Sequence, residues 1–271
     1  MTKETNIHPF DAAIYLTKEN EKYIGKTSDA YKNMIGPFGG VTAASLLKAI
    51  IDHPERKGEP ISLTVNFAAA IKDGKFSIQP RLRRSTRTTQ HWYVELKQKG
   101  SVSITATAVL VRRKDTWSET EARMPEVPLA GELASIPVEG LPAWVGQYDM
   151  RIVKGIPDLD NPKIVEDSTT LQWIKDVPDR PLDVFSLTSI CDAFFPRIFV
   201  KRNEMGLIGT VSLTVHFHAD LKTIGENGER HIFAKAWANK FYNRFFDQTG
   251  EVWSEEGELL ATTNQMVYFR R

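Results

Sequence analysis

Two segments in which apolar and polar residues alternate give the sequence its first recognisable order. Residues 61–67 read Ile-Ser-Leu-Thr-Val-Asn-Phe, and residues 211–217 read Val-Ser-Leu-Thr-Val-His-Phe. Alternation of this kind is typical of a strand that buries one face. The apolar faces hold Leu63, Val65 and Phe67 in the first segment and Leu213, Val215 and Phe217 in the second. The pattern predicts two equivalent strands, 150 residues apart.

A second pair of matching segments lies further along each copy. Residues 105–113 read Thr-Ala-Thr-Ala-Val-Leu-Val-Arg-Arg, and residues 263–271 read Thr-Asn-Gln-Met-Val-Tyr-Phe-Arg-Arg. Each copy therefore runs from a Ser-Leu-Thr-Val strand to a strand that ends in two arginines. We interpret the chain as two versions of one unit of roughly a hundred residues.

Each unit also contains one stretch with helical spacing. Residues 41–51 follow the pair Gly39-Gly40 and carry apolar residues on one helical face. Residues 183–195 are predicted to form the second helix, with Asp183 as N-cap and a proline as the stop. Strands are expected at residues 13–16, 22–24, 61–70, 75–83, 91–98 and 102–112, and at residues 150–153, 170–174, 209–219, 231–238, 251–254 and 259–269.

This order of elements predicts an α+β fold with two tandem units. In each unit a curved antiparallel sheet wraps around one central helix, because a helix followed by a meander does not fit a parallel sheet. We place the units at residues 1–120 and 147–271, with a linker at residues 121–146 in a proline-containing stretch. The units are expected to pair with each other and to form a ligand cleft at their junction.

Composition excludes several classes of function. The hydrophobic fraction is 41%, the charged fraction is 25% and the formal net charge is +1, so neither nucleic acid nor an anionic membrane is an expected partner. No apolar run is long enough to span a bilayer, and residues 1–6 are polar, unlike a signal peptide. The single cysteine, Cys191, excludes an intramolecular disulfide and favours the cytoplasm.

Three polar residues distinguish the second unit from the first. Gln265 lies on an apolar strand face and aligns with Thr107, and Thr210 aligns with Pro60, which has no hydroxyl or N–H. Asp192 lies on the apolar helix, where burial is expected to perturb its pKa. The alternatives are a structural amide, an ordinary strand threonine and a solvent-facing aspartate. Taken together, the three residues predict one functional site per chain, in the second unit.

The chain resembles the acyl-coenzyme A thioesterase II family over nearly its whole length. The resemblance is carried by Phe38-Gly39-Gly40, Arg84-Ser85-Thr86-Arg87, Asp192-Ala193-Phe194-Phe195-Pro196, Val215-His216-Phe217-His218 and the segment from Gly257 to Gln265, in this order. It implies a double hotdog fold and a catalytic aspartate, threonine and glutamine, which match Asp192, Thr210 and Gln265. It also implies acyl-CoA as the substrate. Separately, we expect no metal or cofactor, and a homodimer or a higher homo-oligomer as the assembly.

We expect hydrolysis of the thioester by a water that Asp192 activates and that Thr210 and Gln265 help to hold. Substrate contacts are assigned to Gly39, Gly40, Arg84 and Arg87, the two arginines as partners of coenzyme A phosphates. The alternative for the arginines is a solvated strand end.

Two other functions remain open on the same fold: a non-catalytic acyl-CoA binder or sensor, and an enoyl-CoA hydratase. Residues 158–162 are similar to a hydratase motif, but Lys163 follows where that motif needs a histidine. A metal site at His216, His218 and Asp220 is disfavoured, because histidines alternating on a strand are usually polar-face residues.

Overall fold

The computed structural model describes residues 7–270. Residues 1–6 and Arg271 lie outside this range, so the polar N-terminal segment and the last arginine of the second repeat are not part of the description. None of the described helices is both long enough and apolar enough to cross a membrane.

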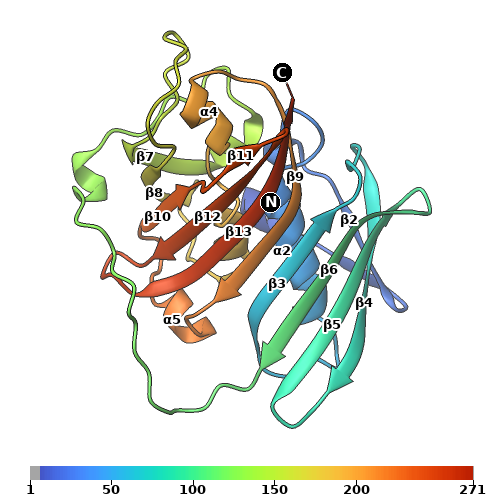
Figure 1. Cartoon of the computed structure of the whole chain (residues 1–271). Coiled ribbons are helices and arrows are strands. Elements are labelled where there is room, and N and C mark those ends of the chain that lie inside the picture. Colours follow the sequence, from blue (N-terminus) through green and yellow to red (C-terminus); the bar gives the residue numbers. More distant parts are fainter. Residues whose placement is uncertain (1–6, 271) are drawn as a thin grey trace, which may run out of the picture.

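One antiparallel sheet of 13 strands runs through the molecule (Figure 1). The strand order is β1-β2-β4-β5-β6-β3-β9-β13-β12-β10-β8-β7, with β11 paired to β12. The first half contains β1 (Thr17–Glu19), β2 (Lys22–Lys26), β3 (Glu59–Phe67), β4 (Lys75–Ser85), β5 (Thr89–Gln98) and β6 (Ser101–Val111). The second half contains β7 (Tyr148–Lys154), β8 (Thr170–Asp176), β9 (Leu207–Phe217), β10 (Ile232–Trp237), β11 (Phe241–Tyr242), β12 (Phe245–Trp253) and β13 (Leu259–Arg270).

The two halves join along β3 and β9, the two strands that the repeat predicted to be equivalent. Thr64 pairs with Thr214 at the centre of this junction, and their hydroxyl oxygens lie 3.0 Å apart. These two threonines occupy the same position in the two copies of the motif. The junction therefore has local two-fold symmetry, as expected when two equivalent units pair through one edge strand.

One central helix accompanies each half of the sheet. In the first half α2 (Gly39–Ile51) is buried along almost its whole length, and small residues such as Ala43 and Ala44 allow the close packing. In the second half Asp183 is the N-cap of α3 (Val184–Ile190), and its carboxylate accepts hydrogen bonds from two N–H groups of the first turn. The shorter helices are α1 (Pro9–Ala13), α4 (Arg197–Arg202) and α5 (Leu221–Gly225), with 3₁₀ turns η1 (Asp29–Tyr31), η2 (Ala130–Glu132) and η3 (Ala143–Gln147). The predicted double architecture is confirmed.

Two predicted elements are wrong. The expected strand at residues 13–16 does not form. Helix α1 ends at Ala13, and residues 14–16 are not in a strand. This helix has Pro9 at its first position and is capped by the side chain of His8. The expected helix at residues 183–195 stops at Ile190. The carbonyl of Ala193 accepts from the Gln172 side chain and that of Phe195 accepts from Arg197, so side chains replace the helical hydrogen bonds there.

The alignment of Gln265 with Thr107 is also wrong, by one residue. Thr64 pairs with Thr107 and Thr214 pairs with Asn264, so Gln265 corresponds to Ala108. A shift of one residue moves a side chain to the opposite face of a sheet. Ala108 is buried, like Gln265, and the first half therefore has an alanine methyl where the second half has an amide.

Candidate active site

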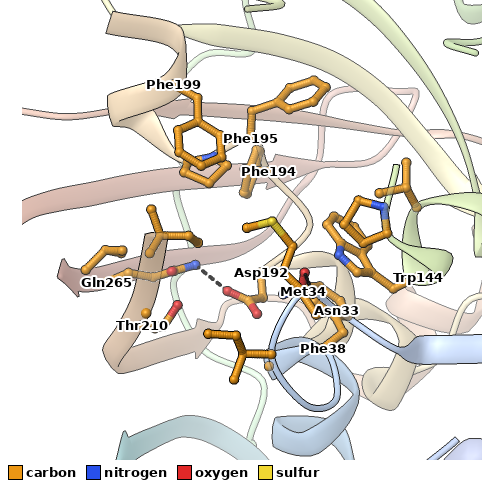
Figure 2. Close-up of a pocket in the computed structure, with 18 of the residues that line it drawn as sticks. Asn33, Met34, Phe38, Trp144, Asp192, Phe194, Phe195, Phe199, Thr210 and Gln265 are labelled. Carbon is orange, nitrogen blue, oxygen red and sulfur yellow. Dashed lines mark hydrogen bonds between the residues drawn. The ribbon is translucent and has the colours of Figure 1, made fainter. Parts of the chain in front are cut away.

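A cavity of about 680 Å³ lies at the junction of the two halves. Its walls come from the loop before α2, the end of β3, the segment before β7, the turn after α3, and strands β9, β12 and β13. Most of the wall is apolar, and it includes Met34, Ile35, Phe38, Trp144, Phe194, Phe195, Phe199 and Met205. Figure 2 shows Phe194, Phe195 and Phe199 on one side of the cavity. Phe38 and Trp144 lie on the other side.

The segment expected to be a linker forms part of this wall. Trp144 stacks on Phe38 with ring centroids 4.2 Å apart and an interplanar angle of 5°. Ile136, Leu141 and Val145 from the same segment also line the cavity. Nothing in the sequence beyond the aromatic residue itself indicated that this connection shapes the site.

Asp192 lies in the turn immediately after α3 and faces the cavity. The amide Nε2 of Gln265 donates a hydrogen bond to Asp192 Oδ1 at 2.9 Å (Figure 2). The backbone N–H of Gly40, in the first turn of α2, also donates to the carboxylate. The structure thus brings together Asp192 and Gln265 of the second half with the start of the helix of the first half.

The glycine pair makes this approach possible. A Cβ atom on Gly39 would lie 2.6 Å from Asp192 Oδ2, closer than real contacts allow. A Cβ atom on Gly40 would collide with the carbonyl oxygen of Ser189 in α3. Both glycines therefore support the site through their lack of a side chain, and Gly39 also lines the cavity.

Burial raises the pKa of Asp192 to about 7, because the ionised carboxylate is removed from water. The hydrogen bonds from Gln265 and from the Gly40 N–H oppose this effect and lower the pKa. The small part of Asp192 that remains exposed lines the cavity. The carboxylate can therefore exchange a proton with a molecule in the cavity near neutral pH.

Thr210 reaches the cavity from β9, next to a bulge. It pairs with Val267, and the equivalent Pro60 pairs with Leu110 next to a bulge of the first half. The correspondence between Thr210 and Pro60 is therefore confirmed. In Figure 2 the side chains of Thr210, Asp192 and Gln265 lie close together.

Arg84 and Arg87 lie away from this site. Arg84 is near the end of β4 and Arg87 is in the turn to β5, and both are exposed. That turn lies beside the start of β3, because Thr89 and Glu59 both pair with Val111. The cavity lies at the opposite end of β3, near Phe67. The structure therefore does not bring the arginines together with Asp192.

The other polar groups singled out in the sequence do not form a second centre. Among residues 7–270, no group of three or more histidine, cysteine, aspartate or glutamate side chains is arranged to hold a metal ion. Asp220 caps α5, and His218 contacts the Thr262 hydroxyl at 2.9 Å. Burial raises the pKa of the Cys191 thiol, so this cysteine is a poor nucleophile.

Sequence reasoning missed two polar residues beside the site. Gln248 lies on β12 directly opposite Gln265, lines the cavity and is only 3% exposed. Arg197 is fully buried and contacts Gln248. A glutamine at an inward position of a strand was the available signal for Gln248.

Together the fold and the cavity define a double hotdog protein with one acid–amide pair at the junction of its halves. Residues 28–111 match the family described as acyl-CoA thioesterase N-terminal domain, and residues 119–269 match acyl-CoA thioesterase C-terminal domain. The second match alone covers more than half of the chain. The chain belongs to the acyl-CoA thioesterase family, and it is a thioester hydrolase.

Solved structures agree with this architecture. A conserved protein of unknown function with a hot dog fold from Alicyclobacillus acidocaldarius is 44% identical, with a TM-score of 0.93 over 97% of this chain and 98% of that one. The acyl-CoA thioesterase II TesB2 from Mycobacterium marinum is 18% identical, with a TM-score of 0.77 over 96% of this chain and 98% of that one. At 18% identity, this similarity shows only that the two proteins share a fold. No curated protein matches the sequence.

Proposed function

We propose that this protein hydrolyses acyl-coenzyme A thioesters to the free acid and coenzyme A, with a nucleophilic water held by Asp192, Thr210 and Gln265. The observation that supports the proposal most is the hydrogen bond from Gln265 to Asp192 inside an apolar cavity. The family membership supports the reaction class, and the resemblance implies that these three residues are the catalytic ones.

Asp192 acts as the general base in this scheme. A carboxylate has about four lone-pair positions, and Gln265 and Gly40 occupy two of them. The remaining positions can accept a hydrogen bond from water. Because its pKa is about 7, the carboxylate is a stronger base than an ordinary aspartate and is still largely ionised at slightly alkaline pH.

Gln265 and Thr210 orient the water. The amide nitrogen of Gln265 faces Asp192, so its carbonyl oxygen is left to accept a second hydrogen bond from the water. The Thr210 hydroxyl contacts the same water from β9, the strand next to that of Gln265. Fixing the water in an attacking geometry supplies a large part of the rate enhancement.

The leaving group needs no strong acid. A thiol has a pKa of about 8.5, so a thiolate departs more readily than an alkoxide or an amine. Asp192, after accepting the proton of the water, can return it to the departing sulfur. This chemistry fits a site whose lining, within the described chain, contains no histidine.

The cavity wall fits the acyl chain better than the nucleotide of the substrate. Within the described residues the charged side chains that line it are Glu139 and Asp192, and neither lysine nor arginine is among them. Phosphate groups are therefore expected outside the cavity. Each buried methylene of an acyl chain contributes about 0.8 kcal/mol to binding, so longer apolar chains should bind more tightly until the cavity is full.

A thiol-release screen over short, medium, long and aromatic acyl-CoAs tests this function. We expect release of free coenzyme A with at least one class of apolar acyl group. Tight binding without thiol release would favour the non-catalytic binder instead, and a loss of absorbance with an enoyl thioester would favour the hydratase. Assembly into a homodimer or larger homo-oligomer and a cytoplasmic location stay predictions, and light scattering of the purified protein tests the former.

A further inference from the structure

A buried cation without a counter-ion lies next to the proposed site. Arg197 is fully buried at the start of α4. Its guanidinium donates to the carbonyl oxygens of Phe195, Ser168 and Ala236, the hydroxyl of Thr170 and the amide oxygen Oε1 of Gln248. All of these acceptors are neutral.

No carboxylate within residues 7–270 contacts this guanidinium. The charge that raises the pKa of Arg197 is Asp167, which forms its own ion pair with Lys154 at 2.6 Å. Burial lowers the pKa of Arg197 to about 9, so the group still carries its charge at neutral pH. An uncompensated buried charge is costly for folding, and such charges are concentrated at functional sites.

Arg197 fixes the orientation of the Gln248 amide. Its Nε lies 3.0 Å from Gln248 Oε1. A guanidinium has donors only, so the amide oxygen must face it and the NH₂ group must point the other way. No residue in the described chain accepts a hydrogen bond from this Nε2. The nitrogen is not fully enclosed by protein atoms. Because Gln248 lines the cavity and is otherwise buried, its free donor is accessible from the cavity.

The hydrolysis proposed above needs such a donor. The N–H of Gly40 already donates to Asp192, as does one of the two N–H groups of Gln265 Nε2, so this pair leaves at most one donor for the carbonyl oxygen of a substrate. Gln248 lies directly across from Gln265 on the neighbouring strand and on the same face of the sheet. Paired residues at such positions are about 5 Å apart at their Cβ atoms, so both amides reach the same part of the cavity.

We propose that Gln248 donates a hydrogen bond from Nε2 to the thioester carbonyl oxygen, and that Arg197 is the positioning residue that aims and polarises this amide. The inference rests on the proposed function. Water attacks the carbonyl carbon while its proton passes to Asp192, and the C=O electron pair moves to the oxygen, where Gln248 stabilises the negative charge. When the C=O bond re-forms, the C–S bond breaks and the thiolate takes the proton from Asp192.

The substitution Gln248→Glu separates this role from a structural one. A glutamate keeps the acceptor for Arg197 and supplies the missing counter-ion, so a purely structural role predicts equal or greater stability and unchanged activity. It removes the donor, however, and places negative charge next to the developing oxyanion. We expect kcat to fall by about 100-fold or more, with KM changed less than about threefold and no decrease in Tm. The matched control is Asn264→Asp, the same amide-to-acid change on the outer face beside Gln265.

The assay uses saturated alkanoyl-CoAs, whose acyl part has one oxygen atom, the carbonyl oxygen. If Gln248→Glu is unstable, Gln248→Met, which has neither donor nor charge, is judged by the same kcat criterion. The inference would be overturned if a folded Gln248 variant kept the wild-type kcat while Asp192→Asn was inactive. A loss confined to acyl groups that carry a second oxygen would overturn it in favour of acyl-group recognition. Failure of the wild type to release thiol from any acyl-CoA would instead reject the proposed function itself.

Discussion

The amide nitrogen of Gln265 lies 2.9 Å from Asp192 Oδ1, and this contact joins the last strand of the chain to the turn after α3. The Gly40 N–H from the other half donates to the same carboxylate. The pair therefore depends on both repeats, although both of its side chains belong to the second one. Because burial raises the pKa of Asp192 to about 7, its ionisation should control activity in the neutral range.

The pH dependence of hydrolysis is the first prediction. If Asp192 must be ionised, kcat/KM should fall about tenfold per pH unit below about pH 7 and level off above it. In Gln265→Leu the hydrogen bond that lowers the pKa of Asp192 is lost, so the midpoint of this limb should move to higher pH. A pH–rate profile of both proteins measures the shift. An unchanged midpoint in a folded variant would show that Gln265 does not influence the pKa of the titrating group.

Asp192 should also make stability depend on pH. Its pKa is raised from 3.8 to about 7 on folding, so between these values the unfolded chain releases the proton first and folding becomes less favourable as pH rises. Asp192→Asn removes this contribution. The stability of the variant relative to the wild type should therefore increase from pH 4 to pH 7 and stay constant above it. Urea unfolding at pH 5 and pH 8 measures this; a pH-independent difference would mean that the carboxylate is solvated.

Gly39→Ala should inactivate the site without unfolding the protein. The new methyl group would lie 2.6 Å from Asp192 Oδ2 and must displace the carboxylate. A displacement of about 1 Å in a catalytic group can reduce turnover by about 100-fold. Gly131→Ala is the matched control, because no atom lies within 4 Å of its added methyl. Full activity of Gly39→Ala, measured by thiol release, would show that the carboxylate position is not critical.

Trp144→Ala should weaken substrate binding rather than chemistry. The stacked pair of Trp144 and Phe38 forms an apolar wall of the cavity. Loss of one aromatic contact of about 1.5 kcal/mol should raise KM for apolar acyl-CoAs about tenfold. Trp117→Ala is the control, because Trp117 is 80% exposed. Equal KM values in both variants would place the acyl chain elsewhere.

The repeat was readable from the sequence because each copy keeps the same inward pattern on a strand that must bury one face. That pattern predicted that β3 and β9 are equivalent strands, and the alternation along β13 predicted that Gln265 lies on an apolar face. The exact register of Gln265 was not readable, because the two arginine pairs at the strand ends are offset by one residue from the true correspondence with Ala108. A match of charged strand ends carries no information about which face is buried.

The residues that sequence reasoning missed act through contacts between distant segments. Trp144 is informative only once the connection between the halves folds back over Phe38. Arg197 resembles an ordinary first-turn arginine until its burial is known, and Gln248 becomes notable only through its contact with that arginine. The early end of α3 was not readable, because the carbonyl of Ala193, beyond the end of the helix, accepts a hydrogen bond from the distant side chain of Gln172.

The most direct test of the central claim compares wild type with Asp192→Asn at pH 8, using an acyl-CoA that the wild type hydrolyses. Thiol release and the Kd for a non-hydrolysable analogue are measured on the same preparations. We predict that kcat falls by about 10²–10⁴-fold in the variant while Kd changes less than about threefold. Undiminished thiol release by the folded Asp192→Asn protein would contradict the account.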